Sequence, residues 1–151
     1  MAPKRRSLTK QKSLQRTERR AAFAETTPRA AKRTTGAATT SETPLTVRAP
    51  GVALEDGLRE YARQRAGFKL GKFGLDITRA TVAFEDVSGP KGATVYECRI
   101  KVVLRHADDV MVGQPGETQR AAFDKAVGAA ERAVRRTLER QDRTAKRARP
   151  R

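Results

Sequence analysis

The sequence predicts an α+β domain in which a four-stranded sheet carries two helices packed on one face, in the order β-α-β-β-β-α. Two stretches, one near each end of residues 45–147, show the apolar periodicity of amphipathic helices. Between them, apolar and polar residues alternate as in half-buried strands. A chain of 151 residues has room for one such domain and a tail. We therefore expect a domain over residues 45–147, a disordered basic tail over 1–44 and a disordered C-terminus over 148–151.

The predicted tail is strongly basic and poor in apolar side chains. It holds 11 Lys and Arg against three Glu, and Phe23 is its only aromatic residue. Such a segment cannot bury enough apolar surface to offset the entropy of ordering the chain. Its richness in Arg and hydroxyl residues also fits an organelle transit peptide, which remains an alternative to a plain disordered tail.

The domain is predicted to begin with a short strand over residues 45–49, closed by Pro50 and Gly51. A helix follows from Leu54 and stops at Gly74, and its apolar side is formed by Leu58, Tyr61, Ala62, Ala66 and Phe73. The pair Glu55 and Asp56 is expected in the first turn of this helix. Acidic side chains are favoured there by the helix dipole, so we interpret the pair as structural and not catalytic.

Three strands are predicted after this helix. The first, over 78–84, directs Thr78, Ala80, Val82 and Phe84 inward, and the second, over 98–104, does so through alternate residues from Cys98 to Leu104. The loop 85–93 between them makes a hairpin, and it lacks the spacing of a phosphate-binding P-loop. We expect at most one phosphate contact from it, by Lys91. A short strand over 110–112 completes the sheet.

The last predicted helix carries Glu117 in its first turn and runs to Arg147. Its apolar stripe contains Phe123, Val127, Ala130, Val134 and Leu138. About 180° away lies a cationic band formed by Lys125, Arg132, Arg136 and Arg143, widened by Arg135, Arg140, Lys146 and Arg147. Only Glu131, Glu139 and Asp142 oppose this charge. A rigid row of guanidinium groups suits a polyanion with a repeating backbone charge, whereas a merely solvated helix face usually mixes signs.

Composition narrows the possible functions. The net charge of +16 indicates an anionic partner such as RNA, DNA or an acidic membrane surface. No apolar run approaches the roughly 18 residues needed to span a bilayer. The single cysteine, Cys98, is predicted to pack in a strand, and the single histidine, His106, has no companions for a metal site. Nucleophile, dinucleotide and Walker motifs are absent, so we predict no enzyme, no cofactor and no small-molecule substrate.

Several short motifs together resemble one known family. They are Leu58-Arg59-Glu60-Tyr61 in the first helix, Phe84-Glu85-Asp86, Gly89-Pro90-Lys91-Gly92 and Cys98-Arg99-Ile100 in the hairpin, and Ala121 to Ala126 with Glu131-Arg132 in the last helix. Residues 45–143 resemble the ribosome hibernation-promoting factor and ribosome-associated inhibitor family, in its short single-domain form. This resemblance implies a four-stranded sheet with two helices on one face and no cofactor. It also implies binding in the decoding region of the small ribosomal subunit, in the space needed by tRNA and mRNA.

The resemblance also implies which side chains contact ribosomal RNA, namely Arg59, Arg65, Lys72, Arg132 and Arg136. The chain departs from the family pattern at Arg120, where an aromatic residue is usual, and at Ala129, where a lysine is common. The resemblance, the helix periodicity and the hairpin loop together give the full set of predicted RNA-binding residues. They are Arg59, Arg63, Arg65, Lys72, Lys91, Lys125, Arg132, Arg135, Arg136, Arg140 and Arg143.

We therefore expect a cytoplasmic, stress-related translation inhibitor that binds the small ribosomal subunit and its RNA. It is expected to be monomeric off the ribosome and to have no membrane association. The alternative function is a general protein for double-stranded or structured RNA, or an RNA chaperone, because a sheet with two helices and a basic face also resembles shape-reading RNA-binding modules.

Overall fold

The computed structural model describes residues 23–24, 43–90 and 92–150. Its sheet has the strand order β1-β2-β3-β4-β5, with bounds β1 Phe23–Ala24, β2 Thr43–Arg48, β3 Ile77–Asp86, β4 Tyr96–Leu104 and β5 Val110–Gly116. The first three strands are parallel, and β3, β4 and β5 are antiparallel neighbours. Helix α3 (Leu58–Leu70) continues into the short 3₁₀ helix η1 (Gly71–Phe73), and the long helix α4 is Gln119–Ala148. The predicted α+β order from β2 to α4 is confirmed.

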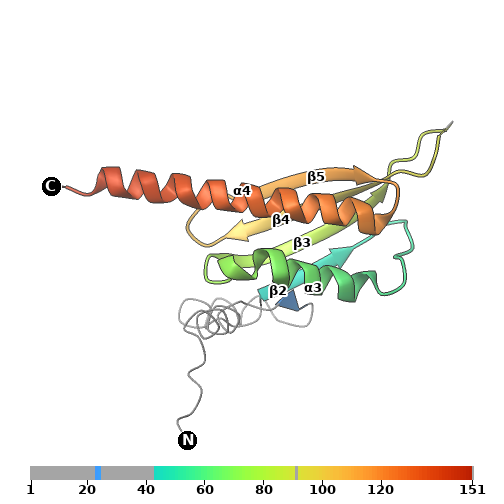
Figure 1. Ribbon diagram of the computed structural model, residues 1–151, viewed down its shortest axis with the longest axis horizontal. Helices are drawn as coiled ribbons and strands as arrows, with labels where there is room; N and C mark the ends of the chain where they lie inside the picture. The colour runs from blue at the N-terminus through green and yellow to red at the C-terminus, as the bar shows by residue number, and fades with distance from the viewer. Residues whose placement is uncertain (1–22, 25–42, 91, 151) are drawn as a thin grey trace, which may run out of the picture.

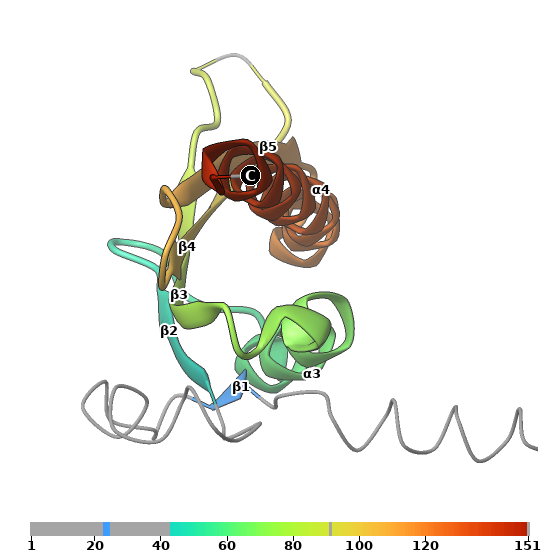
Figure 2. The same ribbon diagram turned by 90° about the vertical axis from the view of Figure 1, so that its left-hand side faces the viewer.

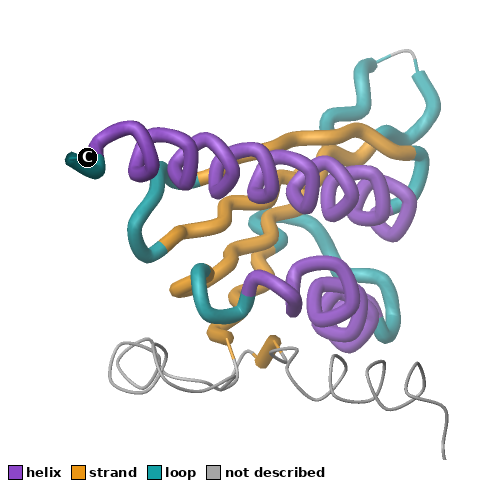
Figure 3. The backbone as a smooth tube through the Cα atoms, turned by 60° about the vertical axis from the view of Figure 1, so that its left-hand side comes forward, coloured by secondary structure: helices purple, strands orange, loops and turns teal. Residues whose placement is uncertain are grey.

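Both helices lie on the same face of the sheet, as Figure 2 shows from the end of α4, and they run beside each other across it (Figure 3). The core fills the space between the two layers. Its largest fully buried side chains include Phe84, Phe123, Leu58 and Ile100. Among the described residues, no helix covers the opposite face of the sheet (Figure 2).

The sheet has one more strand than the sequence predicts. Strand β1 lies inside the segment predicted to be a disordered tail, and it pairs in parallel with β2 through Phe23 and Thr43. The Phe23 side chain is only 1% exposed and belongs to the hydrophobic core. The expectation of a core that begins at residue 45 is therefore wrong for Phe23. Burial of one large aromatic ring is worth a few kcal/mol, enough to hold two residues at a sheet edge. The rest of the predicted tail, residues 1–22 and 25–42, lies outside the described residues.

We expect Phe23→Ala to lower the free energy of unfolding by about 3 kcal/mol, the low end of the range for a core phenylalanine, because the short strand can detach and limit the loss. Phe23→Leu, which keeps most of the volume, should cost about 1 kcal/mol. Urea denaturation of the three proteins measures both values. An unchanged midpoint for Phe23→Ala would show that the ring does not pack in the core.

Strand β3 begins in a different phase from the prediction. The register with β4 shifts between Ile77 and Arg79, so Ile77 is fully buried and Thr78 is only half-buried. The predicted inward position of Thr78 is wrong, whereas those of Ala80, Val82 and Phe84 are confirmed. A bulge adds one residue to a strand and reverses the inward and outward positions before it, which a plain alternation cannot reveal.

The boundaries of both helices also differ from the prediction. Helix α3 begins at Leu58, after Gly57 adopts a left-handed conformation with φ of 70°, so Glu55 and Asp56 precede the helix. Strand β5 continues to Gly116 instead of ending at Val112, and α4 begins only at Gln119, after Glu117. A Cβ atom at Gly116 would collide with the backbone of Ala122, so the strand can pass this close to α4 only with glycine here.

In the described part of the chain, no helix is both long and apolar enough to cross a membrane. The same residues contain no cluster of three or more His, Cys, Asp or Glu side chains that could hold a metal ion. Cys98 is fully buried, as its predicted packing role requires. Burial raises the pKa of its thiol to about 12, so Cys98 is a packing residue and not a reactive thiol.

Candidate nucleic-acid interface

Helix α4 has the two opposite faces that the sequence predicts. Phe123, Val127, Ala130 and Val134 are at most 1% exposed, and Leu138 packs at the edge of the core. The opposite side carries Lys125, Arg132, Arg136 and Arg143, and Arg140 widens this band toward the turn between β4 and β5. We call these five exposed cations the α4 row. Because the apolar stripe is fixed against the sheet, the direction of the α4 row is fixed as well.

The start of α4 is held by the segment that precedes α3. The Thr118 hydroxyl caps the helix by accepting a hydrogen bond from the Ala121 N–H at 3.0 Å. Glu55 and the buried Gln119 exchange two bonds of 2.9 Å, in which each backbone N–H donates to the other side chain. The Gln119 amide also donates to the Ala53 carbonyl at 2.8 Å. These bonds satisfy backbone groups that a helix terminus leaves without partners, and they fix the direction of α4.

Further side chains join α3 to α4. The Tyr61 hydroxyl donates to Asp124 at 2.6 Å, and this bond is the main reason that the pKa of Tyr61 lies above its usual value. The Tyr61 ring meets the Phe123 ring edge-on at 6.0 Å, and the Arg120 guanidinium lies 4.3 Å from the centre of the Tyr61 ring. Arg120 therefore binds an aromatic ring of its own fold, at the position where the resembled family has an aromatic residue.

The α4 row is long and forms no ion pairs with the rest of the described chain. At a rise of about 1.5 Å per residue, the distance from Lys125 to Arg143 is about 27 Å. The C-terminal part of α4 extends past the ends of the strands (Figure 1), and from Asp142 to Pro150 every residue is exposed. A row of exposed cations with this rigid spacing can contact several phosphates of one nucleic acid.

The other predicted RNA-binding residues have partners within the fold. Arg59 donates to the Val47 carbonyl oxygen at 3.4 Å, and Arg63 pairs with Glu60. The Arg65 Nε atom lies 3.7 Å from Asp124. Lys72 and Arg135 both bind Glu131, and Lys91 lies outside the described residues. The structure therefore separates the α4 row from a second group of basic residues whose charge is already partly compensated.

Glu131 balances the charge of several of these basic residues. Its side chain is 15% exposed and binds Lys72 of η1, Arg135 at 2.9 Å and Lys69 at 3.8 Å. Burial acts to raise the pKa of the Glu131 carboxyl, but the hydrogen bond from Lys72 and the charges of the three cations outweigh it, so the pKa lies below its usual value. Glu131 thus joins α3 and η1 to α4 and withholds two predicted RNA-binding residues from a ligand.

We expect Glu131→Gln to lower stability by about 1 kcal/mol and to strengthen RNA binding, because it releases Lys72 and Arg135 and removes one negative charge. The stability difference should be present above pH 4.5 and vanish as the pH falls further, since the native carboxyl is stabilised in its charged form. Urea denaturation at several pH values and an RNA titration measure the two effects. Glu139→Gln, at an exposed position without ion pairs to described residues, is the matched control.

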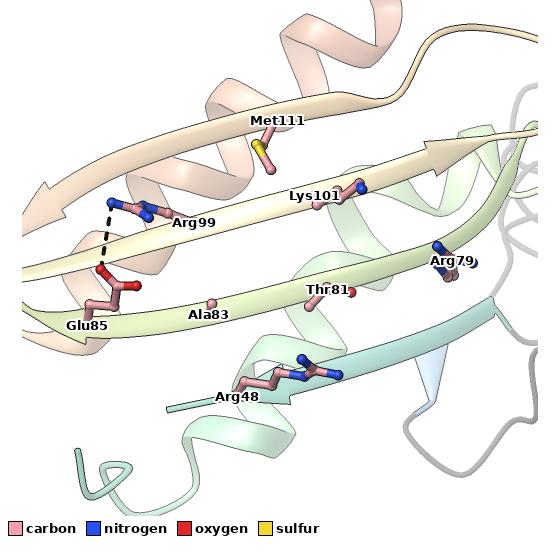
Figure 4. A pocket seen from close by; sticks show the side chains of 8 residues that line it. All are labelled: Arg48, Arg79, Thr81, Ala83, Glu85, Arg99, Lys101 and Met111. Atoms are coloured by element: carbon pink, nitrogen blue, oxygen red, sulfur yellow. Dashed lines mark ion pairs between the residues drawn. The ribbon is translucent and has the colours of Figure 1, made fainter. Parts of the chain in front are cut away.

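The open face of the sheet contains basic residues that the prediction did not include. Arg48, Arg79, Arg99 and Lys101 point outward from β2, β3 and β4, and they line a shallow groove (Figure 4). The alternation of β4 placed Arg99 and Lys101 outward, but only the pairing of three strands brings them near Arg48 and Arg79.

Comparison with known proteins adds one finding. The model of the family described as Sigma 54 modulation protein / S30EA ribosomal protein matches residues 45–142. No curated protein matches the chain. The matched region runs from β2 into α4 and includes every element of the sheet except β1.

Proposed function

Because the chain belongs to the Sigma 54 modulation protein / S30EA ribosomal protein family, a family of ribosome-associated modulation factors, we propose that it silences translation by binding the small ribosomal subunit. In this proposal the protein lies in the decoding region and prevents tRNA and mRNA from entering. Its mechanism is steric, so it needs neither a catalytic group nor a cofactor.

The observation that carries this proposal is the α4 row. Five exposed cations lie on one rigid helix, outside its buried stripe, and none of them has an ion pair among the described residues. Phosphate contacts of this kind position a protein on RNA without reading its sequence. The described strands carry no outward aromatic side chain that could stack on bases. Binding that depends on RNA shape and backbone charge fits a fixed site on a folded RNA such as a ribosomal subunit.

Sedimentation with purified ribosomal subunits tests the proposal. The protein is expected to travel with the small subunit, to protect decoding-region nucleotides from chemical probes, and to be displaced by tRNA bound there. Five phosphate contacts predict a log–log salt slope of about −3.5 to −4.5, so affinity should fall by about a few hundred-fold between 50 and 200 mM salt. A protein that distributes over free structured RNA in proportion to mass, without enrichment on the subunit, would instead be a general RNA binder.

A further inference from the structure

The face of the sheet opposite α3 and α4 forms a groove whose shape follows from the strand register. Across one row the register places Arg48, Ala83, Arg99 and Gly113 side by side, and across the next row Thr46, Thr81, Lys101 and Met111. The small side chains of Ala83 and Thr81 form a low floor along β3. Longer side chains rise on both sides of it, from β2 and from β4, as Figure 4 shows.

Charge is distributed unevenly around this groove. Arg99 lies 3.2 Å from Glu97 and 3.6 Å from Glu85, and Lys101 lies 3.6 Å from Asp109. The cations on the β4 side are therefore compensated. By contrast, Arg48 and Arg79 form no ion pair with any described residue. An anion in the groove would gain most from these two arginines, because their charge is not already balanced by the fold.

The width of the groove favours a single extended strand of nucleic acid as its ligand. Adjacent strands lie about 4.8 Å apart, so β2 and β4 are about 10 Å apart on either side of β3. Beside Lys101, the Met111 side chain is 70% exposed and offers an apolar contact to a sugar or a base. A peptide fits less well. Peptides usually add to the edge of a sheet, where unpaired backbone groups can form hydrogen bonds with them, and the face of a sheet offers no such groups.

We propose that this groove binds a single strand of RNA, with Arg48 and Arg79 on its phosphates and Met111 against a sugar or base. Helix α4 covers one face of the sheet (Figure 2), and the groove lies on the other face. The groove and the α4 row can therefore be occupied at once, and the domain can join two RNA segments. The choice of RNA as the ligand rests on the proposed function, in which the protein binds a ribosomal subunit that consists largely of RNA. The existence of an anion-binding groove rests only on its geometry and charge.

Backbone amide NMR shifts of the full chain, titrated with a short oligouridylate, test this inference. Saturable shifts are expected at Thr81, Ala83 and Met111 as well as on α4. In Arg48→Gln/Arg79→Gln the groove shifts should disappear while those on α4 remain, and the salt slope of total binding should fall by about 1.4. Arg48→Lys/Arg79→Lys, which keeps the charge, should retain most of the groove shifts and serves with thermal unfolding as the control for folding.

Shifts confined to α4 would overturn the groove proposal, as would groove shifts caused by oligoglutamate and not by oligouridylate. Ribosome sedimentation of the wild-type chain separates this inference from the proposed function. If the amide shifts of the groove residues change but the protein does not sediment with ribosomes, then the proposed ribosomal function is wrong and the RNA-binding groove stands. If the protein sediments with ribosomes but the amide shifts of the groove residues do not change, then the groove proposal is wrong and the proposed ribosomal function stands.

Discussion

Charge reversal at two residues of the α4 row, Arg132→Glu with Arg136→Glu, is expected to abolish binding to the small ribosomal subunit and to leave the fold unchanged. Both side chains are exposed and lie opposite the buried stripe. The change removes two phosphate contacts and places two carboxylates against the RNA backbone, where like charges repel. The lost contacts alone lower the salt slope by about 1.4 to 1.8.

A pelleting titration across salt concentrations measures this effect, and thermal unfolding checks the fold. The matched control is Arg132→Lys with Arg136→Lys, which keeps both charges but gives up bidentate contacts, so it should bind more weakly and keep the wild-type salt slope. If the reversed variant pellets with subunits as well as the wild type, then the α4 row is not the ribosome-binding surface.

The second large effect is expected inside the domain, where Val134→Asp should prevent folding at ambient temperature. Val134 is fully buried between α4 and the sheet. An isolated carboxylate there either loses its hydration or takes up a proton, at a cost of several kcal/mol. That cost is comparable with the whole stability of a small domain, about 5 to 15 kcal/mol.

Ala145→Asp provides the matched control, because it introduces the same side chain on the same helix at an exposed position. It should lower stability by less than about 1 kcal/mol, from helix propensity and the helix dipole. Circular dichroism and thermal unfolding compare the two variants, with Val134→Ala as a milder change that keeps the domain folded. A wild-type transition in Val134→Asp would mean that this face of α4 does not pack on the sheet.

The α4 row could be predicted from the sequence because a helix is a local structure. Its 3.6-residue repeat fixes the angle of every side chain around one axis, so the apolar stripe from Phe123 to Val134 determines that Arg132 and Arg136 point outward. Alternation in β4 fixes the inward side of Cys98 and Ile100 in the same way. These positions needed no information about other elements, and the structure confirms them.

Other features depend on contacts between residues far apart in the chain, and they become visible only in the folded protein. Glu55 and Gln119 are 64 residues apart, and neither residue type indicates that the two hold each other. The sequence likewise does not indicate that Glu131 pairs with Lys72. Glu131 balances the charges of Lys72 and Arg135, whereas the cations of the α4 row have no such partner among the described residues.

The order of elements from β2 to α4, the buried and exposed faces of α4 and the motifs of the family could all be predicted from the sequence. They depend on local periodicity and on residues close together in the chain. The tertiary structure decided the place of Phe23, the bulge that buries Ile77, and the groove beside Arg48 and Arg79. Each of these requires a strand register or a packing surface supplied by a distant segment. The free energy of such contacts belongs to pairs of elements, and no single stretch of sequence contains both partners.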